Sequence, residues 1–329
     1  MERVAVIIPN WNGKRFLDAC LQSLRRQTFK DFVTYMVDNG SADDSIAYVE
    51  ANYPEVRVVR HADNLGFSAA INAGIRASTG EYIAALNNDT EVDPGWLQAL
   101  VATLDARSDI GLCASKVLDF KDRSVIDSFG DGYGRYGIAF KIGTLAVDKG
   151  QFDAPMEVLS ACAAASIYRR TMLDDIGVFD EDFFCYMEDV DLGIRALLGG
   201  YKCLVVPTAK VYHIGSASTG GGLSEFSLRM TAKNFPHVLC KNIPASLLWR
   251  ILPIVFVGQI VLIFETLIGR RPQLRKNFAS YWRGLGLALR EMPMMMKKRR
   301  VIQANRRISA ADFYQWIRRA EMQKRTYKA

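Results

Sequence analysis

Short apolar runs alternate with segments of helical periodicity through the first 118 residues. Five apolar runs predict strands, at 4–9, 32–38, 56–61, 82–86 and 110–117. A helical pattern follows each of the first four, with the third and fourth helices expected near 68–77 and 96–104. This alternation predicts βαβ units and a mainly parallel, doubly wound α/β sheet flanked by helices. The strands are almost continuously apolar, as expected where helices cover both faces of a sheet.

The pattern changes after residue 118. Gly- and Asp-rich residues over 119–150 predict turns or a short hairpin above a site, and the small residues of 158–170 predict a buried strand. Residues 184–207 indicate a polar cluster, then a helix, then a strand. The glycine-rich segment 213–222 predicts a loop, either a linker or a lid over bound phosphates, and helices are expected after it.

Each parallel strand ends in polar residues. The endings are "PNWNG" at 9–13, "DNGS" at 38–41, "NLGF" at 64–67 and "NND" at 87–89. A turn accounts for one such ending, because Asn and Asp hydrogen-bond to their own backbone. Four in succession favour a binding site, since the carboxyl ends of parallel strands meet in the ligand crevice of an open α/β sheet.

The residue types at these strand ends narrow the class of ligand. The first strand is not followed by G-x-G-x-x-G, which argues against a nicotinamide or flavin enzyme. Asp38 is placed to accept hydrogen bonds from a base or ribose. Asp89 is placed to hold a divalent metal that bridges a diphosphate, because hard cations often bind one or two carboxylates beside phosphate oxygens.

Six segments, in this order and spacing, resemble the family 2 glycosyltransferases of the GT-A fold. They are "VIIPNWNG", "VDNGSADDS", "NLGFSAAINAGI", "LNNDTEVDPGWL", "YMEDVDLGIRAL" and "VYH". Within this family the chain is most similar to bacterial rhamnosyltransferases, which take the sugar from dTDP-rhamnose. The resemblance covers residues 1–225 as the catalytic domain, and a less specific one to the same subgroup extends into the C-terminal region, 226–329.

The resemblance implies a nucleotide-sugar site and a metal site. Asn87, Asn88 and Asp89 stand where the family has its D-x-D motif, so Asp89 is implied as a ligand of Mg²⁺ or Mn²⁺ and His213 as the residue that completes the metal shell. Asn87 departs from the first Asp of the motif, which removes one charge from the site. The alternative for His213 is a hydrogen-bonded structural histidine. The residues implied in donor binding are Pro9, Asn10, Trp11, Asp38, Asn64, Asn72, Asn88 and Asp89.

The resemblance also implies a catalytic base, Asp189, in "MEDVD". Inverting transfer needs a carboxylate that takes the proton of the acceptor hydroxyl. Glu188 and Asp191 flank this base and are assigned with Trp96 to the acceptor site. The competing interpretations are a helix N-terminal acid for either aspartate and packing in a helix for Trp96.

The charge is divided unevenly along the chain. Residues 269–329 contain 17 Lys/Arg and 3 Asp/Glu, a net charge of +14, whereas the whole chain carries +7, so residues 1–268 carry −7. The 14 uncharged residues of 251–264 are shorter than the roughly 20 of a membrane span, which favours an interfacial helix. Together with the basic segment 294–307 they predict docking on a membrane surface. A solvated charged face and a nucleic-acid site are the alternatives, and we expect no nucleic acid.

These observations predict an inverting glycosyltransferase that moves a sugar, L-rhamnose from dTDP-rhamnose, onto a polyprenyl-diphosphate-linked glycan. We expect it in the cytoplasm, peripheral at the inner face of the cell membrane, since the six cysteines have no disulfide or metal-ligand spacing. A transferase that uses a UDP-hexose, and a non-catalytic nucleotide-sugar-binding protein, are the alternatives.

Overall fold

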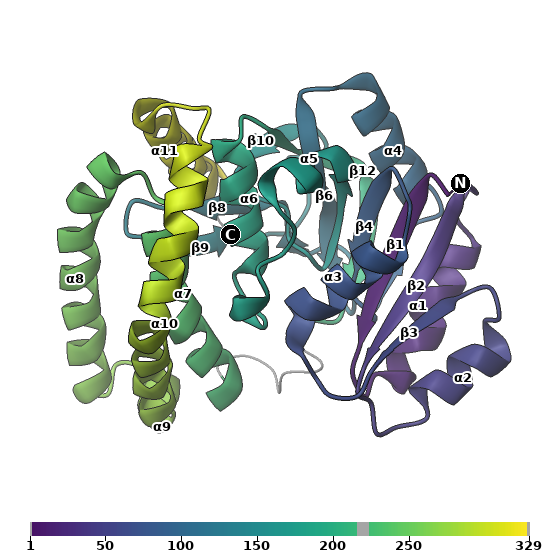
Figure 1. Ribbon diagram of the computed structural model, residues 1–329, viewed down its shortest axis with the longest axis horizontal. Coiled ribbons are helices and arrows are strands. Elements are labelled where there is room, and N and C mark those ends of the chain that lie inside the picture. Colours follow the sequence, from purple (N-terminus) through teal and green to yellow (C-terminus); the bar gives the residue numbers. More distant parts are fainter. Residues whose placement is uncertain (1, 216–223, 328–329) are drawn as a thin grey trace.

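The computed structural model describes residues 2–215 and 224–327. Within these residues the fold is built on one large sheet, with helices on both faces and further helices at one end (Figure 1). The strands are β1 (Val4–Asn10), β2 (Phe32–Asn39), β3 (Arg57–His61), β4 (Tyr82–Leu86), β5 (Thr90–Val92), β6 (Ile110–Asp119), β7 (Ile126–Ser128), β8 (Asp131–Tyr133), β9 (Ala139–Lys141), β10 (Met156–Val158), β11 (Ala165–Arg169) and β12 (Lys202–His213).

The sheet is mostly parallel, as the sequence predicts. Its order is β10-β12-β6-β11-β4-β1-β2-β3, with β5 beside β12 and β7 beside β6. The strands β4, β1, β2 and β3 pair in parallel, and so do β6 and β12. Strand β11 joins the two groups and is antiparallel to both neighbours. The buried strand predicted over 158–170 corresponds to β11 and is shorter than expected. Strand β12 continues to His213, whereas the sequence predicts a strand that ends at 207.

Helices cover both faces of the sheet. They are α1 (Lys14–Arg25), α2 (Ser45–Asn52), α3 (Gly66–Ala77), α4 (Trp96–Ala106), α5 (Arg170–Ile176), the 3₁₀ turn η1 (Glu181–Phe183) and α6 (Glu188–Leu198). In β1 the alternation of side chains decides which face each residue joins. Val6 packs in the core that contains α1 and α4, whereas Ile7 packs in the core that contains α3, α5 and α6. Both faces are dry, which explains the continuous apolar strands.

The Gly- and Asp-rich segment forms the predicted hairpin. Strands β8 and β9 pair in a separate two-stranded sheet, and Gly137 in the turn between them has a positive φ of 75°. Of the predicted loop over 213–222, only residues 213–215 belong to the described part of the chain. The interpretation of this loop as a lid therefore lies outside the described residues.

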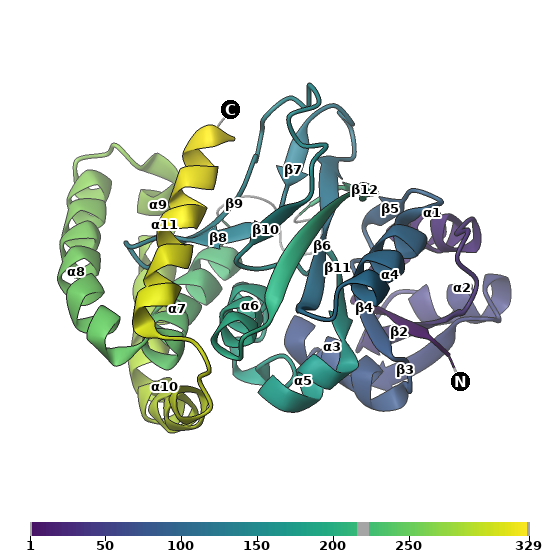
Figure 2. The same cartoon turned by 90° about the horizontal axis from the view of Figure 1, so that it is seen from above.

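The C-terminal region is helical, as expected, and packs against the sheet domain (Figures 1 and 2). Its helices are α7 (Glu225–Asn242), α8 (Ala245–Leu267), α9 (Pro272–Lys276), α10 (Phe278–Ala304) and α11 (Ala310–Thr326). One buried cluster contains Tyr133 of β8 and Val190 of α6 together with Val238, Ile251 and Phe313 of the C-terminal helices. The helices after residue 225 thus share a core with the rest of the protein.

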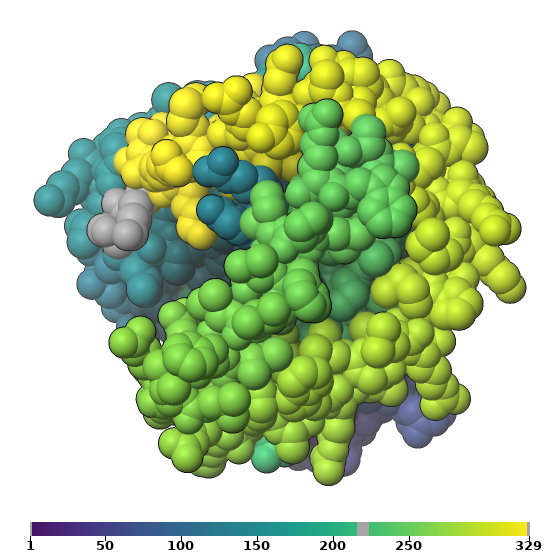
Figure 3. Space-filling view, turned by 90° about the vertical axis from the view of Figure 1, so that its left-hand side faces the viewer, coloured from purple at the N-terminus to yellow at the C-terminus, as the bar shows by residue number. Residues whose placement is uncertain are grey.

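Helix α8 exposes much of its apolar surface. By length and composition α8 is able to cross a membrane. Only 17% of its most apolar 18-residue window is buried within the protein, so α8 is not a core helix. Trp249, Phe256 and Phe264 are 75%, 67% and 60% exposed. In Figure 3, α8 is the green segment that lies across the face at this end of the molecule. A soluble protein seldom leaves so large an apolar face without a partner.

Buried ion pairs attach α7 to the start of α6. Lys241 Nζ lies 2.8 Å from Asp191 Oδ1 and also contacts Asp180. Arg195 Nε donates to Asp191 Oδ2 at 2.9 Å, and Asn242 Nδ2 donates to Oδ1 at 2.7 Å. The Asp191 side chain is fully buried, so these partners must replace its water.

Replacing Lys241 by Met is expected to lower the free energy of unfolding by about 3–5 kcal/mol, because Asp180 and Asp191 lose a buried cation. Urea unfolding at pH 7 measures this loss. The control is Lys14→Met, which removes an exposed pair with Asp44 and should change stability by less than about 1 kcal/mol. Equal effects of the two substitutions would contradict this account of the α6–α7 contact.

Candidate active site

A cavity of about 900 Å³ lies where the strand ends, the β8–β9 hairpin and the segment before α6 meet. The cavity is lined by residues that are far apart in the sequence and that the sequence motifs predict to form one site. The predicted site residues along its wall are Pro9, Asn10, Trp11, Asn64, Asn88, Asp89, Glu188, Asp189 and His213.

Side-chain amides connect the ends of β1, β2 and β4. Asn88 Nδ2 donates to Asn10 Oδ1 at 2.8 Å, and Asn10 Nδ2 donates to Asp38 Oδ1 at 3.2 Å. The second Asp38 oxygen accepts from the Ser41 amide at 3.0 Å. Asp38 is buried behind Asn10 and does not line the cavity, so direct contact with the donor by Asp38 stays a prediction.

The end of β3 is held by a similar contact. Asn64 Oδ1 accepts hydrogen bonds from the Gly66 amide at 2.9 Å and from Asn39 Nδ2 at 3.0 Å. Gly66 has a φ of 87°, and a Cβ there would lie 2.5 Å from the Phe184 carbonyl oxygen. The glycine of "NLGF" is therefore needed for the close approach between α3 and the segment before α6.

Asp89, between the end of β4 and the start of β5, lies beside His213, the last residue of β12. His213 Nε2 lies 3.3 Å from Asp89 Oδ1, and Nδ1 lies 2.9 Å from Asp127 Oδ2. Lys141 Nζ contacts the same Asp127 carboxylate at 2.9 Å. These four side chains form a chain of alternating charge from the hairpin to the strand end.

The electrostatics of this chain favour charged side chains. Burial opposes the imidazolium form of His213, but its contacts with Asp127 and Asp89 raise its pKa to about 9. Burial would likewise raise the pKa of Asp127, yet His213 and Lys141 lower it to about 2. The residues fit a divalent cation that would displace the Nε2 proton of His213: Asp89 would offer a carboxylate oxygen and His213 the freed Nε2, and Asp127 holds the other ring nitrogen as carboxylates do behind metal-bound histidines.

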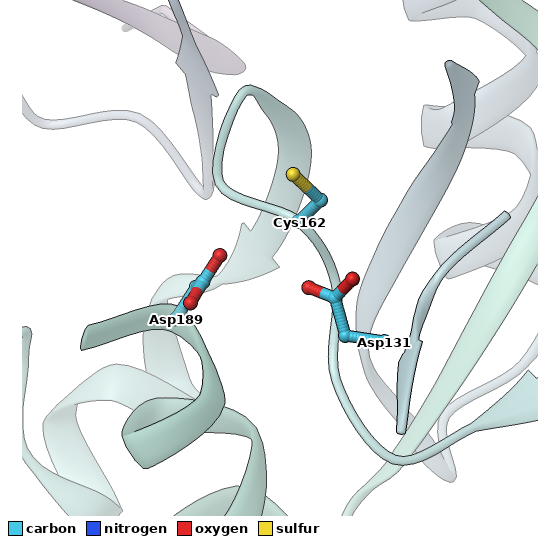
Figure 4. A group of neighbouring side chains, drawn as sticks. All are labelled: Asp131, Cys162 and Asp189. Atoms are coloured by element: carbon cyan, nitrogen blue, oxygen red, sulfur yellow. The ribbon is translucent and has the colours of Figure 1, made fainter. Parts of the chain in front are cut away.

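The second half of the site consists of carboxylates at the start of α6. Asp189 Oδ2 accepts from the Ala163 amide at 3.2 Å, and Oδ1 accepts from the Val190 amide at 2.8 Å. Asp131 and Cys162 stand beside it, and the Asp131, Cys162 and Asp189 side-chain atoms lie within 4.8 Å of one another (Figure 4). The Ser160 hydroxyl donates to the Asp189 carbonyl at 2.7 Å and so attaches α6 to this wall.

Burial raises the pKa of Asp189, against the opposing effect of the two amide hydrogen bonds and of Lys141. Burial and the charge of Asp189 raise the pKa of Glu188 and of Asp131 as well. A carboxylate with a raised pKa is a stronger base, which suits the proton transfer expected of Asp189. The Cys162 thiol is kept protonated because burial raises its pKa, so it is a poor metal ligand.

Three predicted site residues have structural roles instead. Trp96 is completely buried and donates to Ser115 Oγ at 2.8 Å, so the packing alternative is right and the acceptor assignment is wrong. Asn72 Nδ2 donates to the Phe179 carbonyl, and Asn72 Oδ1 accepts from the Phe179 amide. Asn72 does not line the cavity. Asp191 is enclosed by its ion pairs and has no surface left for an acceptor.

Four residues of the site region were not found by sequence reasoning: Asp127, Asp131, Lys141 and Asn234. The first three belong to the hairpin segment, where the Gly- and Asp-rich composition indicated only turns. The sequence feature that could have indicated Asp131 is its position as an acidic residue within the glycine-rich "FGDGYGRYG". Asn234 lies in α7, and no local pattern distinguishes it from the other polar residues of that helix.

Residues 5–177 match the model of the glycosyl transferase family 2 domain, so the chain belongs to this family. One relative is N-acetylglucosaminyl-diphospho-decaprenol L-rhamnosyltransferase from Mycobacterium tuberculosis. It is 30% identical over 240 residues, which cover 65% of this chain and 77% of that protein. The uncharacterized protein y4gI from Sinorhizobium fredii is 31% identical over 66% of this chain, and the match spans only 25% of that longer protein.

Solved structures of glycosyltransferases have the same fold. The mannosyltransferase PcManGT from Pyrobaculum calidifontis, solved with GDP-Man and Mn²⁺, superimposes with a TM-score of 0.55 at 16% identity and covers 99% of this chain and 88% of that one. The predicted GT-A fold is thereby confirmed, and with the family it makes this chain a glycosyltransferase.

The raised pKa of His213 predicts a pH-dependent contribution to stability. The ordinary pKa of 6.5 is raised to about 9, so the contribution is complete below pH 6.5 and is lost as the pH rises through 9. The stability difference between wild type and His213→Gln should be larger by about 3 kcal/mol at pH 6 than at pH 9.5. Urea unfolding in the presence of chelator measures it, and an identical difference at both pH values would contradict the His213 contacts.

Proposed function

We propose that this glycosyltransferase moves L-rhamnose from dTDP-rhamnose, with inversion, onto a sugar hydroxyl of a polyprenyl-diphosphate-linked glycan. The observation that carries the proposal is that Asp89 and His213, on the donor side, and Asp189, on the acceptor side, line one and the same cavity. The Asp89–His213 pair suits a metal-bound diphosphate, and Asp189 with its raised pKa suits a general base.

The donor and acceptor are supported by the relative from Mycobacterium tuberculosis, whose name specifies L-rhamnose and a decaprenol-linked acceptor. About two thirds of this chain align with it. A UDP-hexose is the alternative donor, because the amides around Asn10 and Asn64 can bind either pyrimidine nucleotide. A non-catalytic nucleotide-sugar-binding protein is the remaining alternative, and the raised pKa of Asp189 argues against it.

The residues on the donor side bind and orient the nucleotide sugar. Pro9, Asn10, Trp11 and Asn64 line the part of the cavity formed by the ends of β1 and β3. Trp11 is 41% exposed, which leaves its ring free to lie against a ligand. A divalent cation, Mg²⁺ or Mn²⁺, held by Asp89 and His213 would offset the negative charge that grows on the leaving diphosphate.

Asp189 and Glu188 act on the acceptor. The acceptor hydroxyl loses its proton to the Asp189 carboxylate while its oxygen forms the bond to the anomeric carbon and the bond from that carbon to the diphosphate breaks. The buried Glu188 Oε2 has no hydrogen-bond partner within the described residues, so it is available to an acceptor hydroxyl. Asp131 lies beside Asp189, and burial together with the charge of Asp189 raises the pKa of Asp131, so the proton of this pair is favoured on Asp131 and Asp189 is left to act as the base.

The lipid part of the acceptor agrees with the surface of α8. Its exposed apolar residues are flanked by exposed Arg250 at one end and by exposed Arg270, Arg271, Arg275 and Lys276 at the other. Apolar side chains bordered by basic ones are typical of helices that lie in the surface of an anionic membrane. This surface supports our proposal that the enzyme is a peripheral protein of the cytoplasm at the inner face of the cell membrane.

Asp189→Asn tests the proposed base. The substitution keeps the shape of the side chain but removes its basicity, so rhamnosyl transfer should fall by about 10²–10⁴-fold. Donor affinity should be unchanged, because Asp189 is assigned to the acceptor. Asp174→Asn, at an exposed position of α5, is the control and should keep full activity. Full activity of Asp189→Asn would support the non-catalytic alternative.

The membrane proposal predicts that the double substitution Trp249→Ser and Phe256→Ser abolishes binding to vesicles containing phosphatidylglycerol. The two residues are seven positions apart on one face of α8 and are both exposed, so the fold should be unaffected. Flotation of the full-length protein with vesicles measures binding. Leu145→Asn, at another strongly exposed apolar position, is the control. Equal flotation of the double variant and the control would exclude α8 as the docking surface.

A further inference from the structure

The segment that leads into the catalytic carboxylates has an unusual backbone. Phe184, Tyr186 and Met187 have positive φ values of 63°, 68° and 68°. Such values are rare for residues with a side chain, and they persist only where the surroundings fix them. Met187 is followed directly by Glu188 and Asp189, so the conformation of this segment, which we call the 183–187 loop, decides where the base lies.

The 183–187 loop is also the wall of the cavity. Phe184, Cys185, Tyr186 and Met187 all line it. On the donor side, the Ser68 amide donates to the Phe184 carbonyl at 3.3 Å, and Gly66 lies directly against the same carbonyl. The loop therefore connects the donor-binding end of β3 with the acceptor carboxylates of α6.

Asn234 of α7 supports this loop from the opposite side. Its side chain is completely buried, and Nδ2 lies 3.0 Å from the Phe183 carbonyl, 2.9 Å from that of Cys185 and 2.7 Å from that of Tyr186. The two hydrogens of the amide are thus shared among three carbonyl oxygens that converge because of the left-handed residues. A buried carbonyl without a donor is costly, and this one side chain donates to three carbonyls of the loop.

Packing alone does not account for an amide here. Asn234 Oδ1 is buried and has no hydrogen-bond partner within the described residues. An apolar side chain would avoid that unpaired oxygen, but it would remove the amide donor that the Phe183, Cys185 and Tyr186 carbonyls share, and the Phe183 carbonyl would keep only the Cys185 amide, at 2.8 Å. The amide is therefore explained by its N–H groups.

We propose that Asn234 is a positioning residue of the transferase: its N–H groups hold the 183–187 loop in the left-handed conformation that places Asp189 at the acceptor. This inference rests on the proposed role of Asp189 as the base. The ion pair between Lys241 of α7 and Asp191 of α6 keeps Asn234 close to α6. The C-terminal helices, which carry the proposed membrane surface, thereby also build the catalytic end of the site.

The test compares Asn234→Leu and Asn234→Asp with the matched control Asn242→Leu. Leu removes the donors, and Asp keeps the shape of the side chain but offers only acceptors. Asn242 lies on the same helix, is equally buried and uses its Nδ2 in one hydrogen bond, so its substitution should cost stability without altering the loop.

The first readout is amide hydrogen exchange of the free full-length protein, which requires no substrate. In both Asn234 variants the amides of Phe184 and Cys185 should exchange about tenfold faster, as expected when a net hydrogen bond is lost, whereas Asn242→Leu should leave them unchanged. Wild-type exchange rates in a folded Asn234→Leu or Asn234→Asp protein would overturn the inference.

The second readout is rhamnosyl transfer from dTDP-rhamnose, with Asp189→Asn as the reference. The kcat of both Asn234 variants should fall by about a hundredfold, as for a base displaced by about 1 Å, while the donor KM stays near the wild-type value. If Asp189→Asn is inactive but Asn234→Asp keeps wild-type kcat, the inference is wrong although the proposed function holds. If Asp189→Asn is fully active, the proposed function fails, and the exchange rates alone decide whether Asn234 holds the loop.

Discussion

Parallel pairing of β1 with β2 and β4 is the constraint on which the site depends. The register places Asn10 opposite Asp38, and β4 ends next to β1, so three strands deliver their polar residues to one edge. The buried amide contacts between Asn10, Asp38 and Asn88 then have no water to compete with. The position of Asp89, one residue beyond Asn88, follows from this edge, whereas Asn64 and His213 are contributed by the ends of β3 and β12.

The acceptor side is built differently, from elements that come late in the sequence. Asp189 lies at the start of α6, and Asp131 comes from the hairpin. Helix α7 contacts the 183–187 loop, which connects Asp189 with the donor site. The same C-terminal helices carry the exposed face of α8. The C-terminal helices thus border both the proposed membrane surface and the proposed catalytic carboxylates, which suits an acceptor that is itself attached to a lipid.

Local pattern predicts the sheet and the strand-end residues because each depends on neighbours in the sequence. Asn10, Asn64 and Asp89 each come shortly after an apolar strand, so local pattern alone predicts their place at the cavity. Trp96 and Asp191 were misassigned because their partners, Ser115 for Trp96 and Lys241 for Asp191, are set by tertiary packing. Asp127 behind His213 and Asn234 behind the 183–187 loop were missed for the same reason.

The most direct test of the account is calorimetric titration of the full-length protein with dTDP-rhamnose and with UDP-glucose, each in Mn²⁺ and in chelator. The account predicts binding of dTDP-rhamnose that requires Mn²⁺ and is lost in Asp89→Ala, with little binding of UDP-glucose. Preference for UDP-glucose would contradict the rhamnosyl donor and keep the mechanism. Binding that persists in chelator and in Asp89→Ala would contradict the metal–diphosphate site itself.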